Sequence, residues 1–158
     1  MLRAIGGASL AILMLVVLMQ GWVTARGQNH PEQGLVGSWN LQVTLRDCQT
    51  DAPIVTFPAM NTYNQGGTTQ QTAIPGPEGP ALPGHGTWKH QTGRIYSGAF
   101  QFFQLNPDGT FSRVVVRSAI NLGKSGDEYT SIDTAEIFDA SGNVTDTACS
   151  TTTATRFE

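Results

Sequence analysis

The chain has 158 residues, 9 of them basic and 12 acidic, so its formal charge at pH 7 is −3. This length suits one domain of ordinary size. Charged residues make up 13% of the chain, about half the ~25% typical of globular proteins. The low, acidic charge argues against a surface that binds nucleic acid phosphates and against a polybasic membrane anchor.

The first 25 residues have the pattern of a cleaved signal peptide. Arg3 precedes an almost wholly apolar run over residues 8–19, and Val23 and Ala25 place small residues at positions −3 and −1 of a signal peptidase site. The run is shorter than the ~20 residues that span a bilayer, although an uncleaved anchor is the alternative. We therefore expect a flexible segment over 26–34 and one secreted or periplasmic domain over 35–158, free of the membrane after cleavage.

The rest of the chain is predicted to form strands. In the first strand, Trp39, Leu41 and Val43 alternate with polar residues, as in a half-buried strand. Tight turns rich in Gly, Asn and Asp separate most of the later segments. No segment has an apolar period of 3.6 residues over a helical length. The predicted strands span 36–46, 54–63, 68–73, 85–91, 94–105, 110–122, 128–138 and 144–156.

One connection differs from these turns. Residues 74–84 contain four prolines and three glycines, which exclude both helix and sheet. Connections of this length in compact domains are often lids or binding loops. We expect the 74–84 segment to cover one mouth of the fold, with Ile74 or Leu82 as its apolar contact; a solvated connection is the alternative.

Eight sequential strands with short connections favour an all-β fold, an antiparallel up-and-down β-barrel that is closed. An immunoglobulin-like sandwich would need longer crossovers than most of these turns allow. An eight-stranded barrel has an interior that side chains fill or that holds one small ligand.

The two cysteines, Cys48 and Cys149, are predicted to form a disulfide, since export favours disulfides and two cysteines without neighbouring histidines cannot complete a zinc site. A pair of buried thiols is the alternative. If the two cysteines face each other across the first and last strands, Val43 lies opposite Ala154.

Three features together resemble the lipocalin (calycin) superfamily: Gly37-Ser38-Trp39 at the start of the first strand, eight meander strands, and Arg156 at the end of the last. The chain is most similar to short, exported, lipocalin-like barrels of bacteria. The resemblance implies that Trp39 closes the barrel floor and that Arg156 packs across it, which a cation–π contact would stabilise. The chain differs from true lipocalins because it lacks their long first-hairpin loop and their C-terminal helix.

The sequence contains no catalytic motif. By alternation, His85 and Lys89 share one face of a strand and Trp88 and His90 the other, so the two histidines do not converge as metal ligands. Haem-binding members of the superfamily use a later histidine, and none follows His90. We expect no metal and no cofactor. The acidic residues Asp127, Glu128, Asp133 and Glu136 are predicted to lie in solvent.

The residues that could line a ligand site are mostly aromatic or basic. Arg113 and Arg117 share a face and either lie outside in water or line the lumen to hold an anionic group. The aromatic residues either fill a core or line a pocket. The candidate ligand-binding residues are Tyr63, Leu82, Tyr96, Phe100, Phe102, Arg113 and Arg117.

These features favour an exported, non-enzymatic protein that binds a small apolar or amphipathic ligand in its lumen. One alternative is an enzyme of the small-barrel cyclase or isomerase type, which holds a reactive conformation and excludes water. Another is a filled barrel that acts as an interaction module. A buried acid or base beside apolar walls would favour the enzyme.

Overall fold

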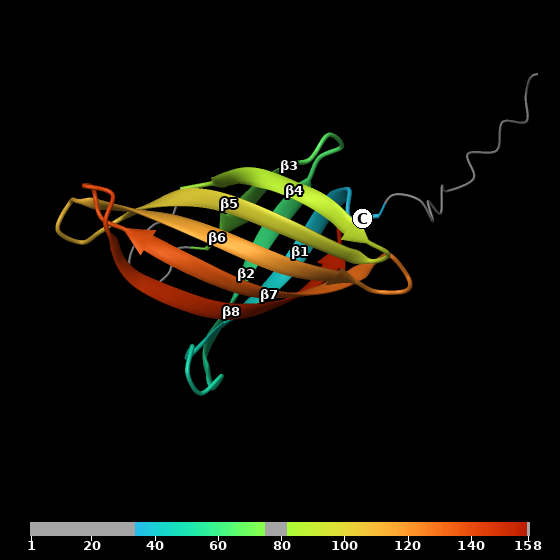
Figure 1. The fold of residues 1–158 in the computed structure, drawn as a ribbon, viewed down its shortest axis with the longest axis horizontal. Helices are drawn as coiled ribbons and strands as arrows, with labels where there is room; N and C mark the ends of the chain where they lie inside the picture. Colours follow the sequence, from blue (N-terminus) through green and yellow to red (C-terminus); the bar gives the residue numbers. More distant parts are fainter. Residues whose placement is uncertain (1–33, 75–81, 158) are drawn as a thin grey trace, which may run out of the picture. The chain divides into compact units, whose positions relative to one another are not determined.

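The protein, seen in a computed structural model, is described over residues 34–74 and 82–157. These residues form one closed barrel of eight antiparallel strands in sequential order (Figure 1). The predicted all-β, up-and-down fold is confirmed. The strands are β1 (Gly37–Arg46), β2 (Pro53–Tyr63), β3 (Thr68–Ala73), β4 (Gly84–Thr92), β5 (Ile95–Leu105), β6 (Phe111–Leu122), β7 (Glu128–Phe138) and β8 (Val144–Arg156).

The strand boundaries differ from the predicted ones by at most one residue. The turn between β5 and β6 shows why turn residues in the sequence locate the strand ends so closely. Asn106 and Gly109 close it with a hydrogen bond from the Gly109 N–H to the Asn106 carbonyl at 3.0 Å. Gly109 has φ of 82°, a conformation that side chains with a Cβ rarely adopt. The predicted signal peptide, residues 26–33 and residues 75–81 lie outside the described residues, and so do the predictions made for them.

The barrel closes between its first and last strands. Trp39 pairs directly with Arg156, and Val43 pairs with Thr152. The predicted pairing of Val43 with Ala154 is therefore wrong by two residues. The reason is that Cys48 lies in the turn after β1, where the Asp47 side chain accepts hydrogen bonds from the backbone of the next residues, rather than on the strand.

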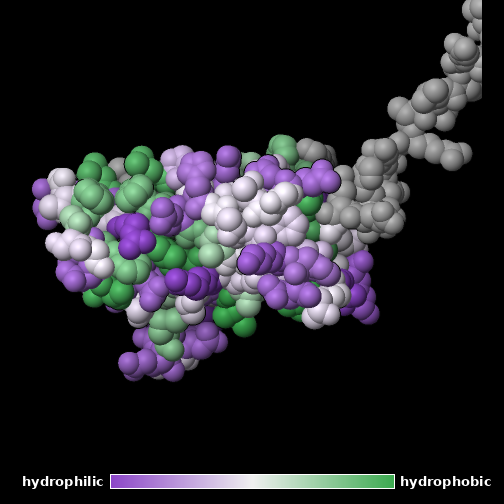
Figure 2. All heavy atoms as spheres, turned by 45° about the horizontal axis from the view of Figure 1, so that its top comes forward, coloured by the Kyte–Doolittle hydropathy of each residue, from purple (hydrophilic) through white to green (hydrophobic). Residues whose placement is uncertain are grey.

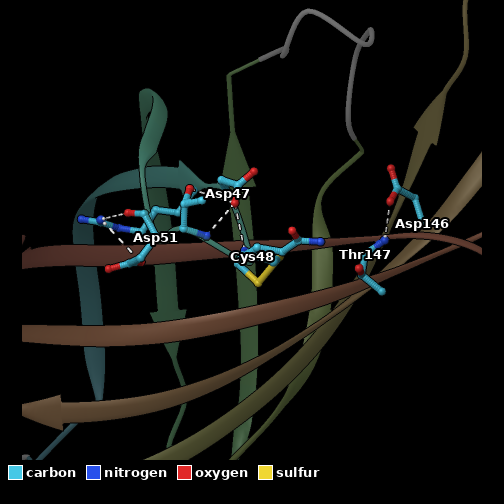
Figure 3. The surroundings of a disulfide bond; sticks show 9 residues. Asp47, Cys48, Asp51, Asp146 and Thr147 are labelled. Atoms are coloured by element: carbon cyan, nitrogen blue, oxygen red, sulfur yellow. Dashed lines mark hydrogen bonds and ion pairs between the residues drawn. A yellow bond between two sulfur atoms is a disulfide. The ribbon is translucent and has the colours of Figure 1, made fainter.

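The predicted disulfide is present. Cys48 and Cys149 are bonded, with their Cα atoms 5.2 Å apart and a sequence separation of 101. Figure 3 shows the bond beside the β1–β2 turn, with Asp47, Asp51 and Asp146 nearby. Because Cys149 pairs with Arg46, the bond joins the β1–β2 turn to the strand that closes the barrel.

One end of the barrel is closed by aromatic packing. Trp39 is completely buried, its ring lies 4.9 Å from that of Tyr129, and its indole N–H donates to the Leu35 carbonyl. The Arg156 guanidinium lies 4.2 Å from the Trp39 ring centroid, as the resemblance implied. We call this closed end the floor.

Arg156 also joins three backbone segments at the floor. Its guanidinium donates to the carbonyls of Gly34, Val36 and Gly126. At Gly37, where φ is 133°, an added Cβ would lie 2.6 Å from Arg156 Nη1, so this position requires glycine. The Gly37-Ser38-Trp39 motif thus lets Arg156 approach the backbone closely.

The described residues include no helix long and apolar enough to cross a bilayer.

We predict that Cys48→Ala/Cys149→Ala lowers the free energy of unfolding. The bond joins residues with a sequence separation of 101, and for a loop of about this length the loop-closure model gives an upper value of about 4–5 kcal/mol. Urea denaturation of the oxidised protein and the double variant measures the difference. Equal midpoints would show that the bond contributes nothing to stability.

We predict that Arg156→Ala destabilises the barrel by about 1–2 kcal/mol, through loss of the Trp39 contact and of the carbonyl partners. Arg113→Ala is the matched control. Arg113 also lies over an aromatic ring, 4.0 Å from the Phe138 centroid, but makes none of the side-chain hydrogen bonds observed for Arg156. Equal losses in the two variants would contradict the role given to the carbonyl contacts.

Candidate functional site

The inside of the barrel differs between its two halves. Inward-facing side chains near the floor are almost fully buried, with Ile120 at 1% exposure and Tyr63 at 4%. Toward the opposite end, inward-facing Phe57, Phe102 and Ile137 are only partly buried, and Val55 is 43% exposed. We call this opposite end the mouth. The turns β1–β2, β5–β6 and β7–β8 border it. Solvent therefore reaches apolar inner walls from the mouth and not from the floor.

The four predicted aromatic residues point into the lumen. Tyr63 and Tyr96 belong to the floor, where each packs against Trp88, with ring centroids 6.0 and 5.8 Å away. Phe100 is 9% exposed, and Phe102, one step nearer the mouth, stacks on it at 6.3 Å. Phe100 and Phe102 thus line the lumen between floor and mouth, while the two tyrosines help to fill it.

Of the other three predicted site residues, the two arginines lie outside the lumen and Leu82 lies at the mouth end of β4. Arg117 forms an exposed ion pair with Glu136 at 2.6 Å, and Arg113 covers the Phe138 ring on the same outer face. Both arginines are outside, which is one of the two orientations that alternation left open. Leu82 precedes β4 and is 58% exposed, with its backbone N–H donating to the Phe103 carbonyl.

Asp133 on β7 is the main residue that sequence analysis missed. It was expected in solvent, and this is wrong: Asp133 is only 5% exposed and faces the lumen. It shares its face with Tyr129 and Ser131, while Ile132 between them points outward and is 70% exposed. The alternation along β7 contained this information, because Asp133 is four residues from Tyr129 and therefore lies on the same face of the strand.

One carboxylate oxygen of Asp133 is well satisfied. Oδ2 accepts hydrogen bonds from the hydroxyls of Ser131 at 3.1 Å and Thr152 at 2.9 Å, with Ser150 further away at 3.4 Å. These donors come from β7 itself and from β8, which pairs Ser150 directly with Asp133. The hydroxyls hold the carboxylate in one orientation.

The other oxygen, Oδ1, is buried and has no hydrogen-bond partner. It is the single buried side-chain nitrogen or oxygen atom in this situation among residues 34–74 and 82–157. Leaving such an acceptor unsatisfied costs about 1–3 kcal/mol, and more when it is charged. An atom of this kind needs a functional or structural reason.

A tyrosine pair lies between Asp133 and the floor. The hydroxyls of Tyr63 and Tyr129 are 3.5 Å apart and buried. Burial raises the pKa of Tyr63 to about 12, and the negative charge of Asp133 adds to this effect. Burial also raises the pKa of Tyr129 well above its usual value. Both phenols therefore stay protonated at neutral pH and can donate hydrogen bonds.

The residues described here form no metal site. His85 and Lys89 point outward, and His90 lies inward on β4 with its Nε2 2.8 Å from the Gly93 carbonyl oxygen. The two histidines diverge, as predicted. Within the described residues no group of three or more His, Cys, Asp or Glu side chains could hold a metal ion.

The mouth is apolar at its rim. Eight of the 12 large apolar side chains that are exposed in the described residues lie at the strand ends around it. In Figure 2 hydrophobic residues gather at the left end, where Figure 1 places the β5–β6 and β7–β8 turns. The rim residues are Ile54, Val55, Ile74, Leu82, Phe103, Leu105, Phe111 and Val144.

The turns at the mouth carry acidic side chains. Hydrogen bonds within the turns lower the pKa of Asp47, Asp108 and Asp139. The largest contributions come from the Thr50 backbone N–H, the Thr110 hydroxyl and the Asn143 backbone N–H, respectively. All three are ionised at neutral pH. Asp51 and Asp146 lie beside the disulfide at the same end (Figure 3).

Two hollows of about 350 and 590 Å³ lie on the outside of the barrel. The larger extends over β4, β5, β6 and β7 between Lys89, Arg117 and Ile132, and the smaller lies across β1, β7 and β8. Both are open to solvent and lined by a mixture of polar and apolar side chains.

No protein-family model matches the chain, and a comparison with curated proteins found no match. An eight-stranded barrel alone does not identify a superfamily. The kinship with lipocalins therefore stays a prediction.

The tyrosine pair predicts a loss of stability at alkaline pH. The folded-state pKa of Tyr63 is about 12, above the ~10 of an unfolded tyrosine. Between these values the unfolded chain has lost a proton that the native protein keeps, so the free energy of unfolding falls as pH rises from about 10 to 12. Urea midpoints across this range measure the effect.

Tyr63→Phe/Tyr129→Phe is the control for this prediction. The double variant removes both phenols with raised pKa, so its stability should fall less over the same range. Identical pH profiles for the two proteins would contradict the assignment.

Proposed function

We propose that this protein is an exported barrel that binds a small amphipathic ligand in its lumen, entering through the mouth. The observation that carries the proposal is the partial exposure of inward-facing apolar side chains, Phe57, Phe102 and Ile137 among them, above a fully packed floor. Apolar walls open to water at one end, with few polar groups at the bottom, are the usual form of a small-molecule site.

The polar groups at the bottom support an amphipathic ligand over a purely apolar one. Asp133 lies below the partly exposed walls, and its Oδ1 has no partner in the protein. An apolar ligand would leave this atom unsatisfied, whereas a ligand with a polar head could bond to it.

Export is supported by the predicted signal peptide and by the disulfide. Disulfides persist in secreted and periplasmic proteins and are rare in the cytosol. The Cys48–Cys149 bond fits an oxidising compartment. The apolar rim of the mouth supports a further step: a ligand can pass from another apolar surface, through contact with the rim, into the lumen.

A second candidate function is an isomerase or cyclase. The buried carboxylate of Asp133 beside apolar walls is the feature that favours it, because such a group can accept or return a proton while water is excluded. An enzyme would release a chemically altered molecule. Mass spectrometry of ligands extracted from the native protein, before and after incubation with the free ligand, separates the two candidates.

We predict that filling the lumen weakens ligand binding. Ala135 is half-buried, faces inward on β7 and lies one step from Asp133 toward the mouth. Ala135→Trp should weaken binding of the neutral apolar dye N-phenyl-1-naphthylamine by about tenfold or more, since an indole would occupy the space of the ligand. Fluorescence titration measures the affinity.

Thr134→Trp is the matched control. Thr134 is the adjacent residue, points outward and lines the larger outer hollow. Its variant should bind the dye as the unaltered protein does. A loss of binding in Thr134→Trp alone would place the dye in the outer hollow and overturn the proposal.

A further inference from the structure

We propose that the lumen selects ligands with an organic ammonium head group, and that Asp133 is the residue that binds it. This inference rests on the proposed lumenal binding and adds the chemical class of the ligand. It starts from the unpartnered buried oxygen, Asp133 Oδ1, below the apolar walls.

The lumen lacks a positive charge that could neutralise Asp133. All eight strands lie in the described residues, and Arg156 is the only arginine or lysine at their inward-facing positions. Its donors bond to floor carbonyls and its face covers Trp39. On β8 it is six residues from Ser150, the partner of Asp133, which is about 20 Å along a strand.

The hydroxyl groups around Asp133 compensate only partly for the burial of its carboxylate. Ser131 and Thr152 donate to Oδ2 and hold the carboxylate in place, but neither supplies a charge. A buried carboxylate is stable only when a cation or a full set of donors compensates for lost water. The missing components are one donor to Oδ1 and one positive charge, and an ammonium group provides both.

A metal cation fits this site poorly. Calcium and magnesium take six or more oxygen ligands, mostly from several carboxylates and carbonyls. Asp133 is the single buried carboxylate at the inward-facing positions of the strands, since Asp146, which pairs with inward-facing Ile137, is exposed at the mouth. The described residues hold no group of metal-ligating side chains. The apolar walls above it instead match the body of an organic cation.

The charges at the mouth favour the same class of ligand. Five carboxylates lie on the described turns and strand ends there, Asp47, Asp51, Asp108, Asp139 and Asp146, against two guanidinium groups, Arg46 and Arg113. A mouth with excess negative charge attracts cations and raises their rate of entry. An anionic ligand would meet repulsion both at the mouth and at Asp133.

Isothermal titration calorimetry with octylammonium and 1-octanol tests the inference, since the two probes share a tail and differ in the charge of the head. The unaltered protein should bind octylammonium about tenfold or more tightly than octanol, the size expected for a charge-assisted hydrogen bond. Asp133→Asn should abolish this preference and keep octanol binding. Glu136→Gln, which removes an outward carboxylate of the same strand, should leave the preference unchanged.

The outcomes separate the two proposals. Equal binding of both probes to the unaltered protein would overturn the ammonium inference and leave lumenal binding intact. Binding of neither probe would overturn both. A preference that persists in Asp133→Asn would show that Asp133 is not the binding residue.

A second measurement needs no variant and so does not depend on the folding of Asp133→Asn. The carboxyl-carbon NMR resonance of Asp133 in the unaltered protein should shift on addition of octylammonium and not on addition of octanol. A resonance that responds equally to both, or to neither, would contradict direct contact between the head group and the carboxylate.

Discussion

Closure of the sheet between β1 and β8 pairs Trp39 with Arg156 and so fixes which face of every strand is inside. Side chains alternate along a strand, so a shift of one residue at this seam would turn the inner set outward. The cation–π contact, the carbonyls bonded by Arg156 and the disulfide all act at this seam or beside it. The floor, the lumen and the position of Asp133 follow from it.

In a closed barrel, every second residue of each strand faces the interior, whether its side chain is apolar, polar or charged. Most are apolar or aromatic here and pack the floor. Near Asp133 the inner residues become hydroxylic, with Ser131, Ser150 and Thr152 around one oxygen. A carboxylate at such a place weakens the fold unless something else compensates its charge, and this cost points to a role in binding or chemistry.

The packed floor and the partly exposed upper walls have different roles: the floor stabilises the barrel, and the upper walls are accessible to solvent. Aromatic rings that interlock around Trp39 and Tyr129 stabilise one end without leaving space for a ligand. The disulfide holds the other end, where the inner side chains are only partly buried. The mouth can therefore stay open without loss of the barrel, because a covalent bond replaces the packing found at the floor.

The sequence by itself determined the eight strands, their turns and the inward phase of Tyr63, Phe100 and Phe102, because a period of two and turn chemistry are local properties. Only the tertiary structure decided three things. The register of β1 against β8 depended on where the β1–β2 turn begins. Alternation places Arg113 and Arg117 on the face opposite Val114 and Val116 without showing which face is inside, and closure of the barrel placed both arginines outside. Asp133 was buried because barrel closure overrides the usual preference of a carboxylate for water, a preference that local sequence reasoning has to assume.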